Sequence, residues 1–179
     1  LRHHGLDLVL YGMESVSKST LVDYRKGTSK NAILECTQIN REAGVKIGGL
    51  FIIGAPTDTR ETHDEMVEYC NEFKEITRVK YLSALPGTAN YKRFIKEGII
   101  KDELLHMDWL SRERSVEEDI EEPGFIKFCD NLSKDELREY YRKVNGVIEK
   151  RPYDYRNPVN VYLPQPDAKF FKRPVYMEN

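Results

Sequence analysis

Two polar side chains close a run of residues that otherwise belongs in a protein core. The stretch from Val9 to Met13 reads VLYGM, and Glu14 and Ser15 follow it directly. A carboxylate and a hydroxyl are costly to bury unless something is present to receive them. The end of this run therefore predicts a place where a polar ligand can sit.

Other groups that could do chemistry are scattered along the chain. A carboxylate base at Glu14 would need a second acidic or basic partner, and Asp58 is the obvious candidate at a strand end. His63 stands near an expected helix start, a position suited to acid–base work, although we expect an exposed polar residue there. The three cysteines lie far apart in sequence, which favours small buried hydrophobic residues over a disulfide framework or a metal site.

Strand and helix patterns alternate three times through the first hundred residues. Apolar runs predict strands at residues 9–15, 45–56 and 79–85. Helices are predicted at 17–26, 28–44, 60–73 and 89–97, with Asp58 and Glu61 as a capping-box-like pair before the third. The expected buried face of the second helix carries Ala32, Cys36, Ile39 and Ala43, and that of the third carries Met66, Cys70 and Phe73.

This alternation predicts the α/β class with parallel strands, because helical crossovers of this kind join strands that run in one direction. In such folds ligands gather where the strands end at their carboxyl side. Glu14 and Ser15, the GAPTD sequence at 54–58 and the ALPGT sequence at 84–88 all fall at that edge. The three strand ends are thus expected to share one rim.

The pattern changes after residue 100. Residues 101–124 are strongly charged, and the acidic run at 117–122 is expected to be solvated. Ser133 and Glu136 form a capping box before an apolar stripe made by Leu137, Tyr140, Tyr141, Val144 and Ile148. The tail from residue 151 holds five prolines and is expected to run extended. We therefore divide the chain into residues 1–100 and a helical extension with a tail at 101–179.

Composition narrows the classes of partner. With 28 Lys and Arg against 30 Asp and Glu, the net charge of −2 gives no reason to expect nucleic acid or an anionic membrane surface. The apolar runs are all far shorter than the ~20 residues that span a bilayer, so no membrane partner is expected. No signal-peptide pattern opens the sequence, and the cytoplasm is the expected location.

Several segments, taken in order, resemble a known family. LRHHGLDLVLYGMES, KGT, REAGVKIGGLFIIGAPTDT and YLSALPGTANY are similar to the second half of the barrel of radical S-adenosylmethionine (SAM) enzymes. The closest branch is the one whose members often carry a cobalamin-binding domain, including anaerobic cyclases and methyltransferases. The resemblance covers residues 1–100 and implies a partial parallel (β/α) barrel that binds SAM for methyl transfer or oxidative cyclisation or rearrangement.

The resemblance also implies roles for individual residues. Glu14 and Ser15 would contact the ribose or methionine part of SAM, and Lys26 would reach its carboxylate. The adenine would lie along the second predicted strand at Ile52 and Gly54 and be flanked by Ala84 and Leu85. The family usually reads Gly-Leu-Pro-Gly-Glu-Thr where this chain has GAPTDT, so the second glycine is missing. The alternatives are structural roles: helix caps for Glu14 and Ser15, a solvated side chain for Lys26, a tight turn for Gly54, and core positions for Ala84 and Leu85.

One part of the family's machinery does not occur in this sequence. A [4Fe–4S] cluster needs cysteine thiolates, and the family supplies three from a Cys-x-x-x-Cys-x-x-Cys loop. The cluster ligands, and any cobalamin-binding domain, are therefore expected outside this fragment, which alone would be inactive on its small-molecule or cofactor-precursor substrate. No catalytic residue is assigned. The alternative is a non-catalytic structural or oligomerisation module, and the open strand edges of a half barrel predict self-association in either case.

Overall fold

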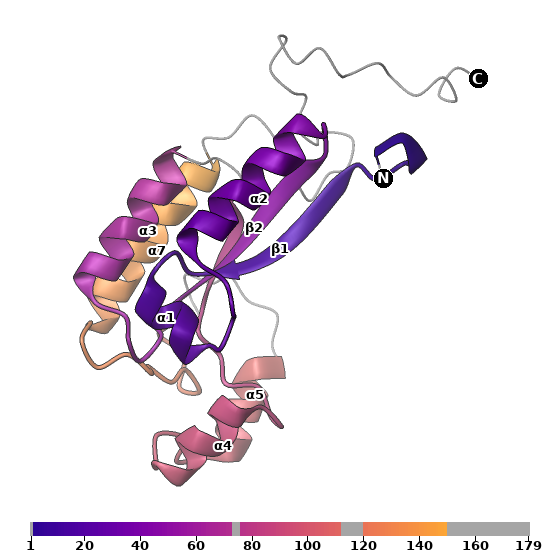
Figure 1. Ribbon diagram of the computed structural model, residues 1–179. Coiled ribbons are helices and arrows are strands. Elements are labelled where there is room, and N and C mark those ends of the chain that lie inside the picture. Colours follow the sequence, from indigo (N-terminus) through magenta and orange to yellow (C-terminus); the bar gives the residue numbers. More distant parts are fainter. Residues whose placement is uncertain (1, 73–75, 112–119, 150–179) are drawn as a thin grey trace.

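Three parallel strands form the centre of this computed structural model, which describes residues 2–72, 76–111 and 120–149. The strands β1 (Leu8–Glu14), β2 (Lys46–Ile53) and β3 (Ile76–Tyr81) lie in the order β1-β2-β3. A short 3-10 helix, η1 (Arg2–His4), precedes them, and the helices are α1 (Lys18–Asp23), α2 (Lys30–Glu42), α3 (Arg60–Glu72), α4 (Ala89–Lys96), α5 (Glu103–Ser111) and α7 (Lys134–Glu149) (Figure 1). The predicted α/β class is confirmed, and the alternation is consistent with a partial (β/α) barrel.

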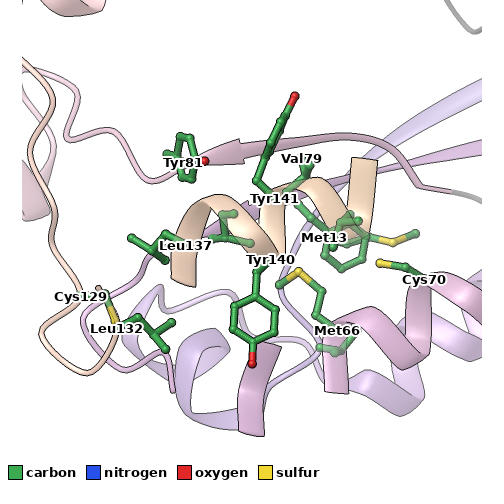
Figure 2. Close-up of a cluster of buried hydrophobic side chains, with 14 of the residues drawn as sticks. Met13, Met66, Cys70, Val79, Tyr81, Cys129, Leu132, Leu137, Tyr140 and Tyr141 are labelled. Carbon is green, nitrogen blue, oxygen red and sulfur yellow. The ribbon is translucent and has the colours of Figure 1, made fainter. Parts of the chain in front are cut away.

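One face of the sheet is buried beneath helices. Successive side chains of a strand point to opposite faces, and the set that includes Met13, Phe51 and Val79 belongs to the main core. Residues from α2, α3 and α7 complete this core, and Figure 2 shows side chains from β1, α3, β3 and α7 meeting within it. The sheet is therefore held in place from this side.

The opposite face of the sheet is open over much of its length. Leu10 and Gly12 on β1 and Arg78 and Lys80 on β3 are all exposed. Among the described residues, the carboxyl end of this face is covered by a second apolar cluster formed by Leu82, Ala84, Tyr91, Phe94, Ile100 and Phe128. The open face and this cluster meet at the ends of the strands, where the candidate site lies.

The buried face of α2 differs from the expected one. Ile33 and Thr37 are buried, whereas Ala32 and Ala43 are exposed and the side chain of Ile39 is 57% exposed. A polar residue can face the core here because the Thr37 hydroxyl donates to the Ile33 carbonyl oxygen at 2.9 Å. The predicted buried face of α2 was therefore wrong. The prediction used the spacing of apolar residues only and did not consider that a threonine hydroxyl can form a hydrogen bond within its own helix.

The turn between β2 and α3 is organised by Asp58, which is not the capping residue we predicted. Its carboxylate accepts from the backbone N–H groups of Gly54 and Ala55, both at 2.9 Å, and from the Thr20 hydroxyl at 2.8 Å. The helix is capped instead by Thr59 and Thr62, whose side chains accept from each other's backbone N–H. The expected pairing of Asp58 with Glu61 is therefore wrong.

The helix after residue 133 follows the sequence closely. Ser133 and Glu136 form the predicted capping box, with N–H to side-chain oxygen distances of 2.8 and 3.2 Å. The stripe residues Leu137, Tyr140, Tyr141 and Val144 are buried in the main core. Because α7 contacts both β3 and α3, residues 134–149 pack on the strand–helix units rather than apart from them.

Some expectations cannot be compared with the described residues. Phe73, residues 117–119 of the acidic run and the tail from residue 151 all lie outside them. The third strand is Ile76–Tyr81, earlier in the chain than the predicted 79–85, and Leu82 to Leu85 belong to the irregular segment that follows it. Among the helices that the structure describes, none is long and apolar enough to cross a membrane.

The hydrogen bonds of Asp58 predict a strong dependence of stability on its carboxylate. Asp58→Asn places an amide N–H₂ among three donors, and we expect the free energy of unfolding to fall by about 1–3 kcal/mol. Urea denaturation measures the difference. Asp135→Asn, at a side chain that is 88% exposed, is the control and should change stability little; equal effects of both substitutions would contradict the role given to Asp58.

Candidate functional site

A hollow of about 200 Å³ lies at the carboxyl ends of the three strands. Glu14 comes from the end of β1, Ile52 from β2, and Leu82, Ser83 and Leu85 from the segment after β3. The loop after α1 and the start of α4 complete it, with Tyr24, Lys26, Thr88 and Asn90. All three strand–helix units therefore contribute to one site, as expected for a ligand site of a parallel sheet.

An ion pair forms the polar side of the hollow. The Lys26 ammonium lies 2.8 Å from Glu14 Oε1, and the two side chains are 35% and 18% exposed. Lys26 stands between Arg25 and Gly27, which both adopt the left-handed conformation, with φ of 53° and 62°. The chain reverses sharply at these residues, and this brings the lysine back to the end of β1.

Gly12 provides the space in which this ion pair lies. A Cβ atom at position 12 would come within 2.6 Å of Glu14 Oε1 and 3.2 Å of Lys26 Nζ. The pair therefore lies over the backbone of Gly12, on the open face of the sheet. A larger residue at this position would push the carboxylate and the ammonium away from the strand.

The backbone of Glu14 is strained. Its φ of 63° falls in the left-handed region, which a side chain other than that of glycine seldom occupies. The pairing of β1 with β2 also shifts register between Gly12 and Glu14. Strain of this kind costs about 1–3 kcal/mol and often accompanies a functional position; here it turns the carboxylate toward Lys26.

Part of the remaining wall of the hollow is apolar, beside the polar Ser83, Thr88 and Asn90. Ile52 is half-buried, Leu82 is 7% exposed and Leu85 is 55% exposed, so Leu85 is an apolar side chain left open to a ligand. Tyr24 lies at the same site, and burial raises the pKa of its hydroxyl. The hollow thus sets an apolar surface beside a carboxylate and an ammonium, which suits a flat ring attached to a polar group.

A second hollow of about 530 Å³ adjoins the first and shares Tyr24, Thr88 and Asn90 with it. Its other side is formed by α1 and α4, where Arg93 Nη1 lies 3.2 Å from Asp23 Oδ1. The shared residues make the two hollows neighbours. A ligand longer than the first hollow can extend in this direction.

Four of the seven sequence-predicted site residues line the first hollow: Glu14, Lys26, Ile52 and Leu85. They come from three different strand–helix units, and the fold brings them together. Tyr24, Ser83 and Gly12 also belong to this place, and sequence reasoning missed them. The spacing of Gly12, two residues before Glu14 and hence on the same strand face, is the signal that could have found it.

The other three predicted residues have structural partners. Ser15 is 1% exposed, and its Oγ accepts from the Ser17 backbone N–H at 3.1 Å. Gly54 has φ of 90°, and its N–H donates to Asp58. Ala84 is also 1% exposed, and its carbonyl oxygen accepts from His106 at 3.0 Å. None of these three residues lines either hollow.

His63 is buried rather than exposed, so its expected exposure was wrong. Its imidazole is 1% exposed, and Nδ1 donates to the Thr59 carbonyl oxygen at 3.0 Å. Nε2 lies 3.6 Å from Asp58 Oδ2, which is too far for a hydrogen bond. Burial lowers the pKa of His63, and the Asp58 carboxylate offsets this only in part.

The cysteines do not assemble into a metal site. Cys70 and Cys129 are buried and Cys36 is half-buried, and none of the three forms a disulfide bond in the described part of the chain. Across residues 2–72, 76–111 and 120–149, no three His, Cys, Asp or Glu side chains are grouped so as to hold a metal ion. The side chains present here therefore do not fit an iron–sulfur cluster, whereas the hollow offers groups that fit a nucleoside.

Comparison with known proteins gives two partial matches, and no protein-family model matches the chain. Over 114 residues the chain is 33% identical to a bacteriochlorophyllide d C-8(2)-methyltransferase from Chlorobaculum tepidum, covering 59% of this chain and 23% of that protein. Over 59 residues it is 36% identical to a Methanocaldococcus jannaschii protein named "Putative methylthiotransferase", covering 33% and 13%. The chain spans less than a quarter of the length of these curated relatives. Both names describe the transfer of a methyl or methylthio group.

The strained backbone of Glu14 predicts an unusual order of stabilities. Glu14→Gly and Glu14→Ala lose the same ion pair, but glycine adopts positive φ without strain, so the glycine variant should be about 1 kcal/mol more stable. Urea denaturation measures the difference. Glu68 is an exposed residue of α3. At this position Glu68→Ala should be about 1 kcal/mol more stable than Glu68→Gly, because glycine weakens a helix. An alanine variant at position 14 as stable as the glycine variant would contradict the strain.

The lowered pKa of His63 predicts a loss of stability in weak acid. In the unfolded chain the imidazole protonates near its ordinary pKa of 6.5, whereas the folded chain takes up this proton only at lower pH. The unfolded state binds more protons in this window, so the free energy of unfolding should fall as the pH drops below about 6.5. Urea denaturation at several pH values measures this dependence, and the free energy of unfolding should fall less steeply with decreasing pH in His63→Asn than in the wild-type chain. The same steepness in both proteins would show that His63 does not cause the pH dependence.

Proposed function

We propose that this chain is the SAM-binding half of a radical SAM iron–sulfur enzyme. The observation that carries the proposal is the hollow at the strand ends, where Glu14, Lys26, Ile52 and Leu85 line one space. The same four positions follow from the resemblance of the sequence to that family. The names of the two relatives support a reaction that transfers a methyl or methylthio group.

The chemistry of SAM matches the two sides of the hollow. The ribose hydroxyls are donors and suit the Glu14 carboxylate, while the carboxylate of the methionine part suits the Lys26 ammonium. The adenine ring would lie against Ile52 and Leu85. In the absence of a ligand, the ion pair between Glu14 and Lys26 keeps both charged groups oriented. A bound ligand would then form additional hydrogen bonds with each of the two groups.

Four parts of the proposal extend beyond the residues of this chain: the cluster, the cobalamin-binding domain, the reaction of the whole enzyme and its location. A [4Fe–4S] cluster would be held by cysteines outside this sequence, and a cobalamin-binding domain would also lie elsewhere. Cluster and SAM together supply radical chemistry, and the residues described here would bind and orient the SAM. The reaction of the whole enzyme is then a methyl transfer or an oxidative cyclisation or rearrangement, and the enzyme is proposed to act in the cytoplasm.

Calorimetric titration of the chain with SAM tests the proposal. Glu14→Gln keeps the shape of the side chain and loses its charge, so SAM should bind about tenfold more weakly, as expected for a lost charged hydrogen bond. Glu65→Gln is the matched control, because Glu65 forms an ion pair of 3.0 Å with Lys30 away from the hollow. It should leave the affinity unchanged.

Two results would contradict the proposal. If the wild-type chain does not bind SAM, the hollow is not a SAM site. Equal weakening by Glu14→Gln and Glu65→Gln would show that the effect comes from net charge and not from the hollow.

A further inference from the structure

Unsatisfied polar atoms gather at the second hollow. Asp23 Oδ2, the Tyr24 hydroxyl, and Nε and Nη2 of Arg93 are buried and have no hydrogen-bond partner within the described part of the chain. All three residues line the hollow of about 530 Å³ beside α1 and α4. A buried polar atom without a partner costs about 1–3 kcal/mol, and such atoms are rare in folded proteins. Their concentration at one hollow therefore indicates a ligand that supplies their partners.

The ion pair of Arg93 with Asp23 uses only part of the guanidinium. Nη1 lies 3.2 Å from Asp23 Oδ1, and the face of the group lies over the Phe94 ring, with Cζ 4.8 Å from the ring centroid. Nε and Nη2 lie along one edge of this planar group and can donate two parallel hydrogen bonds to an anion. The side chain is 35% exposed, so a small turn of the guanidinium presents this edge to a ligand in the hollow. Arg93 therefore contributes two donors, while its charge is balanced by Asp23.

Arg25 supplies the positive charge that is not balanced. It is exposed and lines the same hollow, and its side chain has no ion pair or hydrogen bond with the other described residues. Its φ of 53° belongs to the turn that also carries Lys26, so this turn gives one cation to each hollow. Two arginines against one aspartate leave a net positive charge along the second hollow. Charge complementarity therefore favours an anionic group there.

The first turn of α4 adds backbone donors. Thr88 caps this helix by accepting from the Tyr91 N–H at 3.2 Å. The N–H groups of Ala89 and Asn90 lie too early in the helix to have an intrahelical acceptor, and both residues line the hollow. Such N–H groups and an arginine edge are typical partners of phosphate, whose three oxygens accept more donors than the two of a carboxylate. The anion that fits is therefore a phosphate group.

The carboxylate of Asp23 calls for a hydroxyl group on the same ligand. Its Oδ2 can only accept hydrogen bonds, so phosphate oxygens cannot satisfy it, whereas a hydroxyl can donate to it. The side-chain amide of Asn90 can donate to and accept from hydroxyl groups as well, and Asn90 lines both hollows. A volume of about 530 Å³ lies within the range of small-molecule sites. The hollow therefore suits a phosphate attached to a hydroxylated body.

We propose that the second hollow binds a sugar phosphate, with Arg25 and the Nε–Nη2 edge of Arg93 on the phosphate and Asp23 on a sugar hydroxyl. The inference goes beyond the proposed function, because none of these contacts involves SAM. Each of the two proposals can therefore fail by itself.

Calorimetric titration of the full chain with ribose 5-phosphate and with inorganic phosphate tests the inference. The wild-type chain should bind ribose 5-phosphate about tenfold more tightly, because a hydroxyl bonded to a carboxylate is added. Arg93→Lys can keep the ion pair with Asp23 but loses the edge with two donors, so both probes should bind about tenfold more weakly. Arg25→Asn tolerates the left-handed turn and removes the unbalanced charge, so both probes should bind about fivefold more weakly.

Lys92→Asn is the matched control. It removes the same charge from an exposed position of α4 that lines neither hollow, and it should leave both affinities unchanged.

Several results would overturn the inference. They are the absence of ribose 5-phosphate binding, equal affinity of the wild-type chain for both probes, unchanged affinity in either arginine variant, and an equal loss in Lys92→Asn. Titration of the same samples with SAM separates the two proposals. SAM binding without ribose 5-phosphate binding defeats this inference alone, and ribose 5-phosphate binding without SAM binding defeats the proposed function alone.

Discussion

The ion pair between Glu14 and Lys26 is the interaction around which the site is arranged. It joins the end of the first strand to the loop after the first helix, and both groups are only partly exposed. Three backbone features make it possible: the positive φ of Glu14, the left-handed turn at Arg25 and Gly27, and the missing side chain at Gly12. An ion pair at a surface contributes little to stability by itself, so the pair alone does not offset the strain at Glu14; under the proposed function, the strained strand end holds the two charges ready for a ligand.

The two faces of the sheet differ in how they are covered by the described residues. The face beneath α2, α3 and α7 holds the main core, and Asp58 fastens the turn from β2 to α3 by accepting three hydrogen bonds. The other face keeps its side chains open except at the strand ends, where the second cluster closes over Ile52. The hollow lies at the boundary of these regions, so Ile52 in its floor is packed against the second cluster while Leu85 stays exposed. This is the usual place for a ligand in folds of parallel strands.

The sequence predicted the order and type of the elements better than their buried faces. The first two strand runs and the capping box of Ser133 are local signals that correspond closely to the structure, whereas the third strand begins three residues earlier than predicted and the Asp58–Glu61 cap does not form. The face of α2 was mispredicted because Thr37 is buried through a hydrogen bond within its own helix. Of the predicted site residues, Glu14, Lys26, Ile52 and Leu85 meet at the hollow, whereas Ser15, Gly54 and Ala84 face structural partners. The directions of Ser15, Gly54 and Ala84 depend on the backbone conformation of the turns after the strands. A sequence motif alone does not determine that conformation.

The central claim is that the carboxyl ends of the three strands together form one binding site for an adenosyl group. A crystal structure of the chain bound to S-adenosylhomocysteine tests it most directly, because this molecule keeps the nucleoside and the amino acid and cannot react. The account predicts ribose hydroxyls within hydrogen-bond distance of Glu14, the ligand carboxylate at Lys26 and the adenine between Ile52 and Leu85. A nucleoside bound elsewhere, with the Glu14–Lys26 pair unchanged over Gly12, would contradict it.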